Sequence, residues 1–271
     1  MLLFIEKNIK KCYSDKSIFP NGGTVLEKEK KKQTIKLCIA ISIIVIILTV
    51  VGMIMIKYEV EGDKNMPFNL SKIVMVSTAE GVENKGKNKW NFNIYQNNDI
   101  YFYIDKNEKY HGNNTYIEKV RIENIQIVRM PTKGKIKTYM PNSTQGRLYS
   151  YSKEYIVEEK LEYKGGSKSN AQALEIGNQG GNILIRFSNT DLGQYSSNKD
   201  KEIIHDGTLL KKLKLTKEDL QFTVSFDIVI EVAHHQYRGN ITLDFPQGDI
   251  LEKGTESIEK TDMNDIIFKR E

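Results

Sequence analysis

Cysteine is scarce in this chain of 271 residues: the two cysteines are Cys12 and Cys38, and none follows residue 38. No disulfide can therefore hold the long stretch after residue 56, which must rely on its own hydrophobic core, as a stretch of about 200 residues can. A thiolate nucleophile is missing there as well. Sortase-like enzymes and cysteine transpeptidases, which depend on such a nucleophile, are therefore excluded.

Metal-binding motifs are also missing after residue 56. The histidines show neither His-x-x-x-His spacing nor accompanying cysteines; they are His111, His205, His234 and His235. Adjacent residues on a strand point to opposite faces, so His234 and His235 are expected at an exposed hairpin tip and not as a chelating pair. The Asp- and Asn-rich stretch 105–114 lacks the alternating ligands and closing glutamate of a calcium loop. We expect no metal and no cofactor.

Catalytic serine and carboxylate patterns are weak. The Ser-x-x-Lys spacing of serine transpeptidases begins at Ser150 and at Ser196, but the companion motifs of that class are missing. Chance matches are expected in a chain so rich in serine and lysine. A glycosidase needs a positioned pair of carboxylates, and no pair stands out among the acidic residues. The sequence predicts no catalytic residue, and a cell-envelope hydrolase using a carboxylate pair is the alternative.

The sequence does contain one uninterrupted apolar run, Leu37 to Ile56, with no charge and no proline. With a rise of about 1.5 Å per residue, a helix of this length matches the roughly 30 Å hydrocarbon core of a bilayer. The run is apolar on all sides, which disfavours a buried core helix. No small-residue cleavage site follows it, which disfavours a cleaved signal peptide. We predict an uncleaved single-pass anchor in the lipid bilayer.

Charge is distributed unevenly around this run. Residues 1–36 carry nine lysines and four acids, whereas the remaining 31 basic and 31 acidic residues all follow residue 56. Cytoplasmic flanks of membrane spans carry an excess of Lys and Arg. We therefore predict a cytoplasmic amino terminus and an extracytoplasmic carboxy terminus at the cell membrane. The part after residue 56 has no net attraction for a polyanion, so nucleic acid is not an expected partner.

Four parts are expected: a basic cytoplasmic tail 1–36, a transmembrane helix 37–56, a polar linker 57–66 and an extracytoplasmic domain 67–271. From Pro67 onward, apolar and polar residues alternate between turn residues, as in antiparallel strands. About ten short strands without intervening helices predict a mainly β domain, most simply a β-sandwich with an immunoglobulin-like arrangement. Two β sub-domains divided near residue 165 are the alternative.

Three hairpins follow from this alternation. The clearest covers residues 222–245, with its turn at 233–240. A second is expected to turn at residues 96–99, Gln-Asn-Asn-Asp, and a third at the glycine-rich residues 177–181.

Two further local features can be predicted. The apolar positions change parity near Glu123 and Asn124, which predicts a β-bulge. One helix is expected near residues 208–215, where leucines share a face, and Thr216 with Asp219 is expected to cap a further turn.

Tyrosines are the one surface feature of note. Tyr149, Tyr151 and Tyr155 fall on one side of an expected strand, and Tyr101 and Tyr103 on one side of another. Rows of such rings can stack on sugars or anchor a protein partner. Tyrosine is also a good strand residue that bridges core and solvent. These five tyrosines are candidate ligand-binding residues.

Four stretches resemble a known group of proteins: MPFNLSKIVMVSTAEG (66–81), YQNNDIYFYIDKN (95–107), GNQGGNILIRFSN (177–189) and YRGNITLDFPQGDI (237–250). They are similar to stretches of uncharacterised single-pass membrane proteins from Gram-positive gut bacteria. The resemblance covers the span and most of the part that follows, and it implies the same membrane topology but no activity.

The sequence thus favours a non-catalytic, extracytoplasmic binding module at the bacterial cell envelope. Its ligand would be a cell-wall glycan or a membrane-protein partner. A structural accessory subunit of a membrane complex is an alternative from another class.

Overall fold

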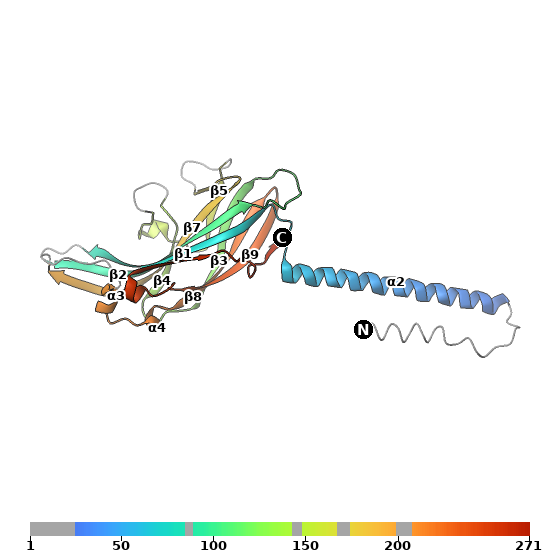
Figure 1. The fold of residues 1–271 in the computed structure, drawn as a ribbon, viewed down its shortest axis with the longest axis horizontal. Helices are drawn as coiled ribbons and strands as arrows, with labels where there is room; N and C mark the ends of the chain where they lie inside the picture. Colours follow the sequence, from blue (N-terminus) through green and yellow to red (C-terminus); the bar gives the residue numbers. More distant parts are fainter. Residues whose placement is uncertain (1–24, 85–88, 143–147, 167–173, 199–207) are drawn as a thin grey trace. The chain divides into compact units, whose positions relative to one another are not determined.

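The structure, a computed structural model, describes residues 25–84, 89–142, 148–166, 174–198 and 208–271 (Figure 1). The expectations for residues 1–24 and for His205 fall outside these ranges. The chain divides into two units, Met1–Lys57 and Tyr58–Glu271. The second unit is continuous across residue 165, where the alternative of two sub-domains placed a boundary.

Helix α2 (Val25–Glu61) contains the whole apolar run Leu37 to Ile56. In the described part of the chain it is the one helix that is long and apolar enough to cross a membrane. The two hydroxyl side chains within the apolar run make their hydrogen bonds inside the helix. Ser42 Oγ donates to the Cys38 carbonyl (2.9 Å) and Thr49 Oγ1 to the Val45 carbonyl (2.7 Å), so neither hydroxyl needs water.

The expected linker 57–66 is shorter than the sequence indicated, because the helix continues through Glu61. It ends at Gly62, whose φ of 69° is left-handed and suits a glycine after a helix. The Gly62 amide donates to the Tyr58 carbonyl (2.8 Å), and the Asp63 amide donates to the Phe268 carbonyl (2.7 Å). The segment is therefore fixed by hydrogen bonds within the second unit.

The second unit is mainly β, with two sheets among its described residues. Sheet A has, in spatial order, β10 (Thr255–Lys260), β1 (Phe68–Asn84), β2 (Lys89–Lys106), β7 (Gly180–Asn198) and β4 (Lys135–Tyr139). Sheet B has β11 (Phe268–Arg270), β9 (His235–Phe245), β8 (Phe222–Val232), β3 (Ile117–Arg129), β5 (Lys160–Gly165) and β6 (Glu175–Ile176). Neighbouring strands are antiparallel except β5 and β6.

Both sheets contribute to one hydrophobic core. The Phe102 and Phe187 rings of sheet A lie 5.6 and 6.0 Å from the Phe226 ring of sheet B. A second, smaller core lies against sheet A at Phe92 and Ile94. Three short helices supply most of its leucines: α3 (Thr208–Lys212), α4 (Lys217–Leu220) and α5 (Ile250–Lys253).

Several local predictions are confirmed. β8 and β9 form the expected hairpin, but its turn is only Ala233–His234, both with positive φ (46° and 68°), and β9 begins already at His235. This geometry suits a two-residue hairpin turn. The bulge is present: Asn124 has φ 55° and the β3–β8 register shifts between Glu123 and Gln126.

The helical predictions are confirmed in part. α3 lies within the range 208–215, and Thr216 and Asp219 form a reciprocal capping box at α4. Helix α5 was not expected. It has only four residues, too few to show a pattern of apolar positions. It ends at Gly254, which has a left-handed backbone conformation.

The predictions of the two other hairpins are wrong. β2 is one continuous strand through residues 96–99, where the sequence indicated a turn. Residues 177–181 do turn, and the Gly180 amide donates to the Gly177 carbonyl (3.1 Å). However, β6 pairs with β5 in sheet B and β7 belongs to sheet A, so this turn joins two sheets.

Candidate functional site

A polar segment in the middle of sheet A marks the candidate site. The four residues of β2 expected at a turn are all buried: Gln96, Asn97 and Asn98 are fully buried and Asp99 is 8% exposed. Ile100 and Phe102, next in the strand, belong to the core. Because faces alternate along a strand, Asn97, Asp99, Tyr101 and Tyr103 lie on the opposite face. We call this the outer face of sheet A.

An ion pair lies at the centre of the outer face. Asp99 pairs across the strands with Arg186 of β7. Arg186 Nε donates to Asp99 Oδ1 (2.5 Å) and Nη2 donates to Oδ2 (2.8 Å), with both side chains nearly buried. Burial acts to lower the pKa of Arg186, but the hydrogen bonds and charge of Asp99 outweigh it and raise the pKa above its usual value. The guanidinium is therefore a fixed cation.

Tyr151 extends this network from the segment that follows β4. Its hydroxyl donates to Glu80 Oε2 (2.6 Å) and accepts from Asn97 Nδ2 (2.7 Å). Asn97 in turn accepts from Ser188 Oγ (2.7 Å). Burial, followed by the Glu80 carboxylate, raises the pKa of Tyr151. The tyrosine thus stays a neutral hydroxyl within a bonded network.

Tyr149 covers the same ion pair. Its ring centroid lies 4.2 Å from the Arg186 guanidinium carbon, and the residue is 5% exposed. Burial raises the pKa of Tyr149. A stacked, buried cation of this kind stabilises the packing of the segment on the sheet.

The expected strand with Tyr149, Tyr151 and Tyr155 on one side is wrong. Residues 148–152 are not in a strand, and Lys153–Tyr155 is a turn of 3₁₀ helix. The chain is held across β4 by a bridge between Tyr139 and Ile156 and by the Met140 amide donating to the Tyr155 carbonyl (2.9 Å). Tyr149 is buried and Tyr151 is half-buried against sheet A, while Tyr155 donates to Asn142 Oδ1 (3.3 Å).

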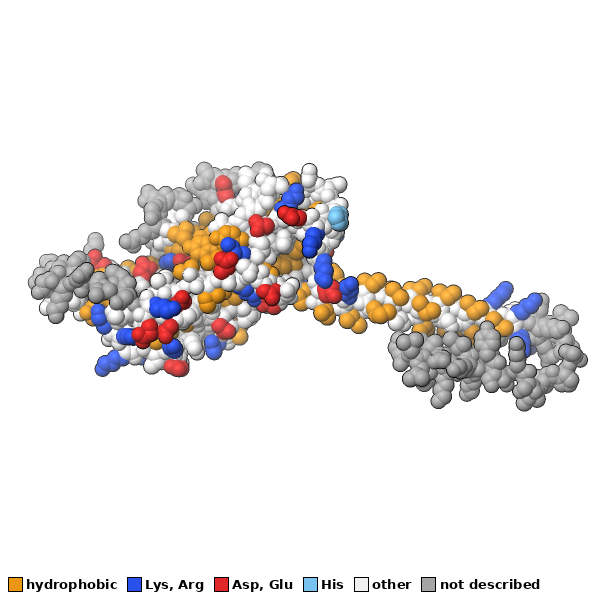
Figure 2. Space-filling view, viewed as in Figure 1, with side chains coloured by type: hydrophobic (Ala, Val, Ile, Leu, Met, Phe, Trp, Pro, Cys, Tyr) orange, Lys and Arg blue, Asp and Glu red, His pale blue; other side chains and the backbone are white. Residues whose placement is uncertain are grey.

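Tyr101 and Tyr103 do lie side by side on β2 as expected, and both are half-buried. Cross-strand pairing places Val74 and Leu184 on either side of Tyr101, and Lys72 and Asn182 on either side of Tyr103. Lys72 Nζ lies 4.5 Å from the Tyr103 ring centroid. We call this surface the tyrosine face: Lys72, Val74, Tyr101, Tyr103, Asn182 and Leu184. Figure 2 shows hydrophobic-coloured side chains gathered on sheet A, with Lys, Arg and acidic groups among them.

The outer face of sheet B has a different character. Arg121 pairs with Glu231 (2.9 Å) and Glu123 (3.1 Å), and Arg238 pairs with Glu123 (2.8 Å) and Asp227 (3.0 Å). Val229, which lies opposite Arg121 and Arg238, is fully buried beneath these side chains. Around Val229, this face is covered by its own ion pairs.

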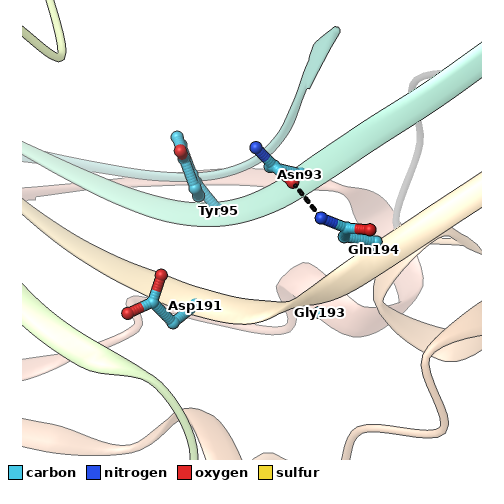
Figure 3. A pocket seen from close by; sticks show the side chains of 5 residues that line it. All are labelled: Asn93, Tyr95, Asp191, Gly193 and Gln194. Carbon is cyan, nitrogen blue, oxygen red and sulfur yellow. Dashed lines mark hydrogen bonds between the residues drawn. The ribbon is translucent and has the colours of Figure 1, made fainter. Parts of the chain in front are cut away.

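A depression lies on the outer face of sheet A beyond Tyr151. It has a volume of about 360 Å³ and is lined by Asn93, Tyr95, Asp191, Gly193 and Gln194 (Figure 3). This volume is within the range of small-ligand sites. Tyr95 is also packed edge-on against Tyr151, with ring centroids 4.8 Å apart. We call it the bulge depression, because β7 bulges there.

In the described part of the chain no group of three or more His, Cys, Asp or Glu side chains could hold a metal ion. The buried carboxylates of Asp99 and Asp227 are each paired with an arginine, Arg186 and Arg238 respectively. His234 is exposed at its hairpin tip and His235 is half-buried. The chain matches no protein-family model, no curated protein and no solved structure.

Proposed function

We propose that this chain is a membrane-anchored, extracytoplasmic binding module without catalytic activity, and that its ligand is an envelope glycan. Helix α2 would span the membrane with its amino terminus in the cytoplasm, as the lysine excess before it favours. The two sheets would form a β-sandwich, since they share one core. The immunoglobulin-like arrangement stays a prediction.

The contrast between the two outer faces carries this proposal. On sheet B the ion pairs of Arg121 and Arg238 cover the apolar residue beneath them. On sheet A the tyrosine face leaves two rings and two aliphatic side chains half-exposed on a sheet that the Arg186–Asp99 pair holds rigid. Rings with an apolar body and a polar tip suit a ligand that has both apolar and hydroxyl surfaces.

A glycan is favoured over a membrane-protein partner by the residues around the two rings. Asn182 and Lys72 flank Tyr103, and the bulge depression adds further amides. Amide and hydroxyl side chains can both donate and accept hydrogen bonds, as sugar hydroxyls require. A protein interface of standard size would be expected to have a more apolar centre. No described residue specifically favours a hydrolase or an accessory subunit.

The test is co-sedimentation of the full-length protein, in detergent micelles, with insoluble cell-wall sacculi. We expect saturable binding. The double variant Tyr101→Ala with Tyr103→Ala should lower the affinity at least about tenfold, because each ring contributes stacking and buried contact area. Tyr116→Ala serves as the matched control, since Tyr116 is an exposed tyrosine (43%) outside the tyrosine face. Absence of saturable binding by the intact protein would contradict the glycan proposal and turn the search to membrane proteins.

A further inference from the structure

We propose that the bulge depression binds an acetamido group of the glycan; this inference rests on the proposed function and names one specific subsite on the same sheet face. Asn93 and Tyr95 of β2 line one side, and Asp191, Gly193 and Gln194 of β7 line the other (Figure 3). The ligand would be a sugar chain whose units carry N-acetyl groups.

The first observation is an interrupted ladder of polar pairs between β2 and β7. Ser196 Oγ donates to Asn91 Oδ1 (2.6 Å), Gln194 Nε2 donates to Asn93 Oδ1 (3.0 Å), and further along Ser188 Oγ donates to Asn97 Oδ1 (2.7 Å). Each pair joins residues directly opposite each other in the register. At Tyr95, between the second and third pairs, the ladder has no such rung.

A β-bulge causes the interruption. Ile94 pairs with Gly193 and Gln96 pairs with Asn189, so residues 190–192 of β7 all lie opposite Tyr95. Asp191 has φ 61° and Gly193 has φ 148°, conformations that side chains adopt at a cost. A Cβ on Gly193 would lie 3.2 Å from Leu213 Cδ1. Bulges that re-aim side chains in this way are common beside functional sites.

The groups around the depression complement an acetamido group. The Asn93–Gln194 hydrogen bond uses neither Asn93 Nδ2, a donor, nor Gln194 Oε1, an acceptor. The Asp191 side chain is exposed and contacts only Lys135 Nζ at 3.7 Å among the ion pairs of described residues. An acetamido group offers one carbonyl acceptor and one N–H donor, and its methyl group can pack on the Tyr95 ring.

The experiment is calorimetric titration of the full-length protein in lipid nanodiscs with tetra-N-acetylchitotetraose and, in parallel, with cellotetraose, which has hydroxyls in place of acetamido groups. Asn93→Asp is the informative variant, because its carboxylate still accepts from Gln194 but lacks the amide donor. Asn91→Asp is the matched control, because it makes the same charge change at a cross-strand pair outside the depression. Thermal unfolding of each variant verifies folding.

We expect the acetylated sugar to bind more tightly than cellotetraose. Asn93→Asp should lower the affinity for the acetylated sugar about three- to tenfold, which is the effect of one hydrogen bond. Asn91→Asp should leave its affinity unchanged. Equal affinity for the two sugars, no binding of the acetylated one, or an equal effect of both variants would overturn the subsite. Wall binding that persists and still depends on Tyr101 and Tyr103 would then leave the proposed function standing.

Discussion

At the scale of single residues, Arg186 determines the state of the outer face of sheet A. Its guanidinium makes two hydrogen bonds to Asp99, lies against the Tyr149 ring and approaches the Tyr151 hydroxyl (3.4 Å). Planar, bidentate and stacked contacts of this kind are available to arginine and not to lysine. Arg186 therefore contacts both tyrosines of this segment, which Glu80 and Asn97 also hold to the sheet through the Tyr151 hydroxyl.

Arg186→Lys should lower the free energy of unfolding by about 2 kcal/mol, because the charge is kept while the bidentate hydrogen bonds to Asp99 and the stacking on Tyr149 are lost. The matched control is Arg129→Lys, which changes an exposed pair with Asp244 (3.5 Å) and should cost less than about 0.5 kcal/mol. Urea unfolding of the two variants measures the difference. Equal effects would show that the buried pair contributes no more than a surface pair.

At the scale of elements, regular alternation was readable from the sequence. The β8–β9 hairpin could be predicted because Phe222, Val224 and Phe226 alternate with polar residues and face the core. The Asn124 bulge could be predicted because a change of parity has few other causes. The cap formed by Thr216 and Asp219 could be predicted from their spacing alone.

The polar centre of β2 could not be read in the same way. Gln96 to Asp99 has the composition of a turn, and composition alone predicted one. The contrary signal was parity: Ile94, Ile100 and Phe102 all fall on even positions, as in one uninterrupted strand. The residues that hydrogen-bond to Asn97 and Asp99, such as Tyr151 and Arg186, are distant in sequence, so these contacts depend on tertiary structure.

The ion pairs on sheet B should make stability depend on pH. Burial acts to raise the pKa of Glu123 and of Asp227, but hydrogen bonds from Arg238 and other neighbours outweigh it, and both pKa values are lowered. A carboxyl with a lower pKa in the folded state stabilises it above the unfolded pKa, near 4, and this contribution is lost as the pH falls through the folded pKa.

We therefore expect the free energy of unfolding to fall between pH 5 and pH 3, and to fall less in Asp227→Asn, which has no carboxyl to protonate at that position. Urea unfolding at a series of pH values measures both slopes. A variant whose stability falls as steeply as that of the natural chain would show that Asp227 is not among the groups responsible.

At the scale of the whole molecule, the chain combines one helix that is long and apolar enough to cross a membrane with one β unit, and the proposed function places this protein at a membrane surface. The helix contains a stretch, Lys30–Glu61, that can cross a bilayer, and the chain before Leu37 carries the lysine excess. A glycan-binding role requires the β unit to lie outside the cytoplasm. The orientation is therefore the condition on which the proposed function and the acetamido subsite both depend.

Cysteine labelling tests this orientation, because no cysteine follows residue 38. One chain carries Cys12→Ser, Cys38→Ser and Glu108→Cys, which places a thiol at an exposed position after β2; its matched partner carries only Cys38→Ser and keeps Cys12. In intact protoplasts, a membrane-impermeant maleimide should label the Glu108→Cys chain and spare Cys12, and both should react after lysis. Labelling of Cys12 alone in intact protoplasts would place the β unit in the cytoplasm and remove the wall glycan from its reach.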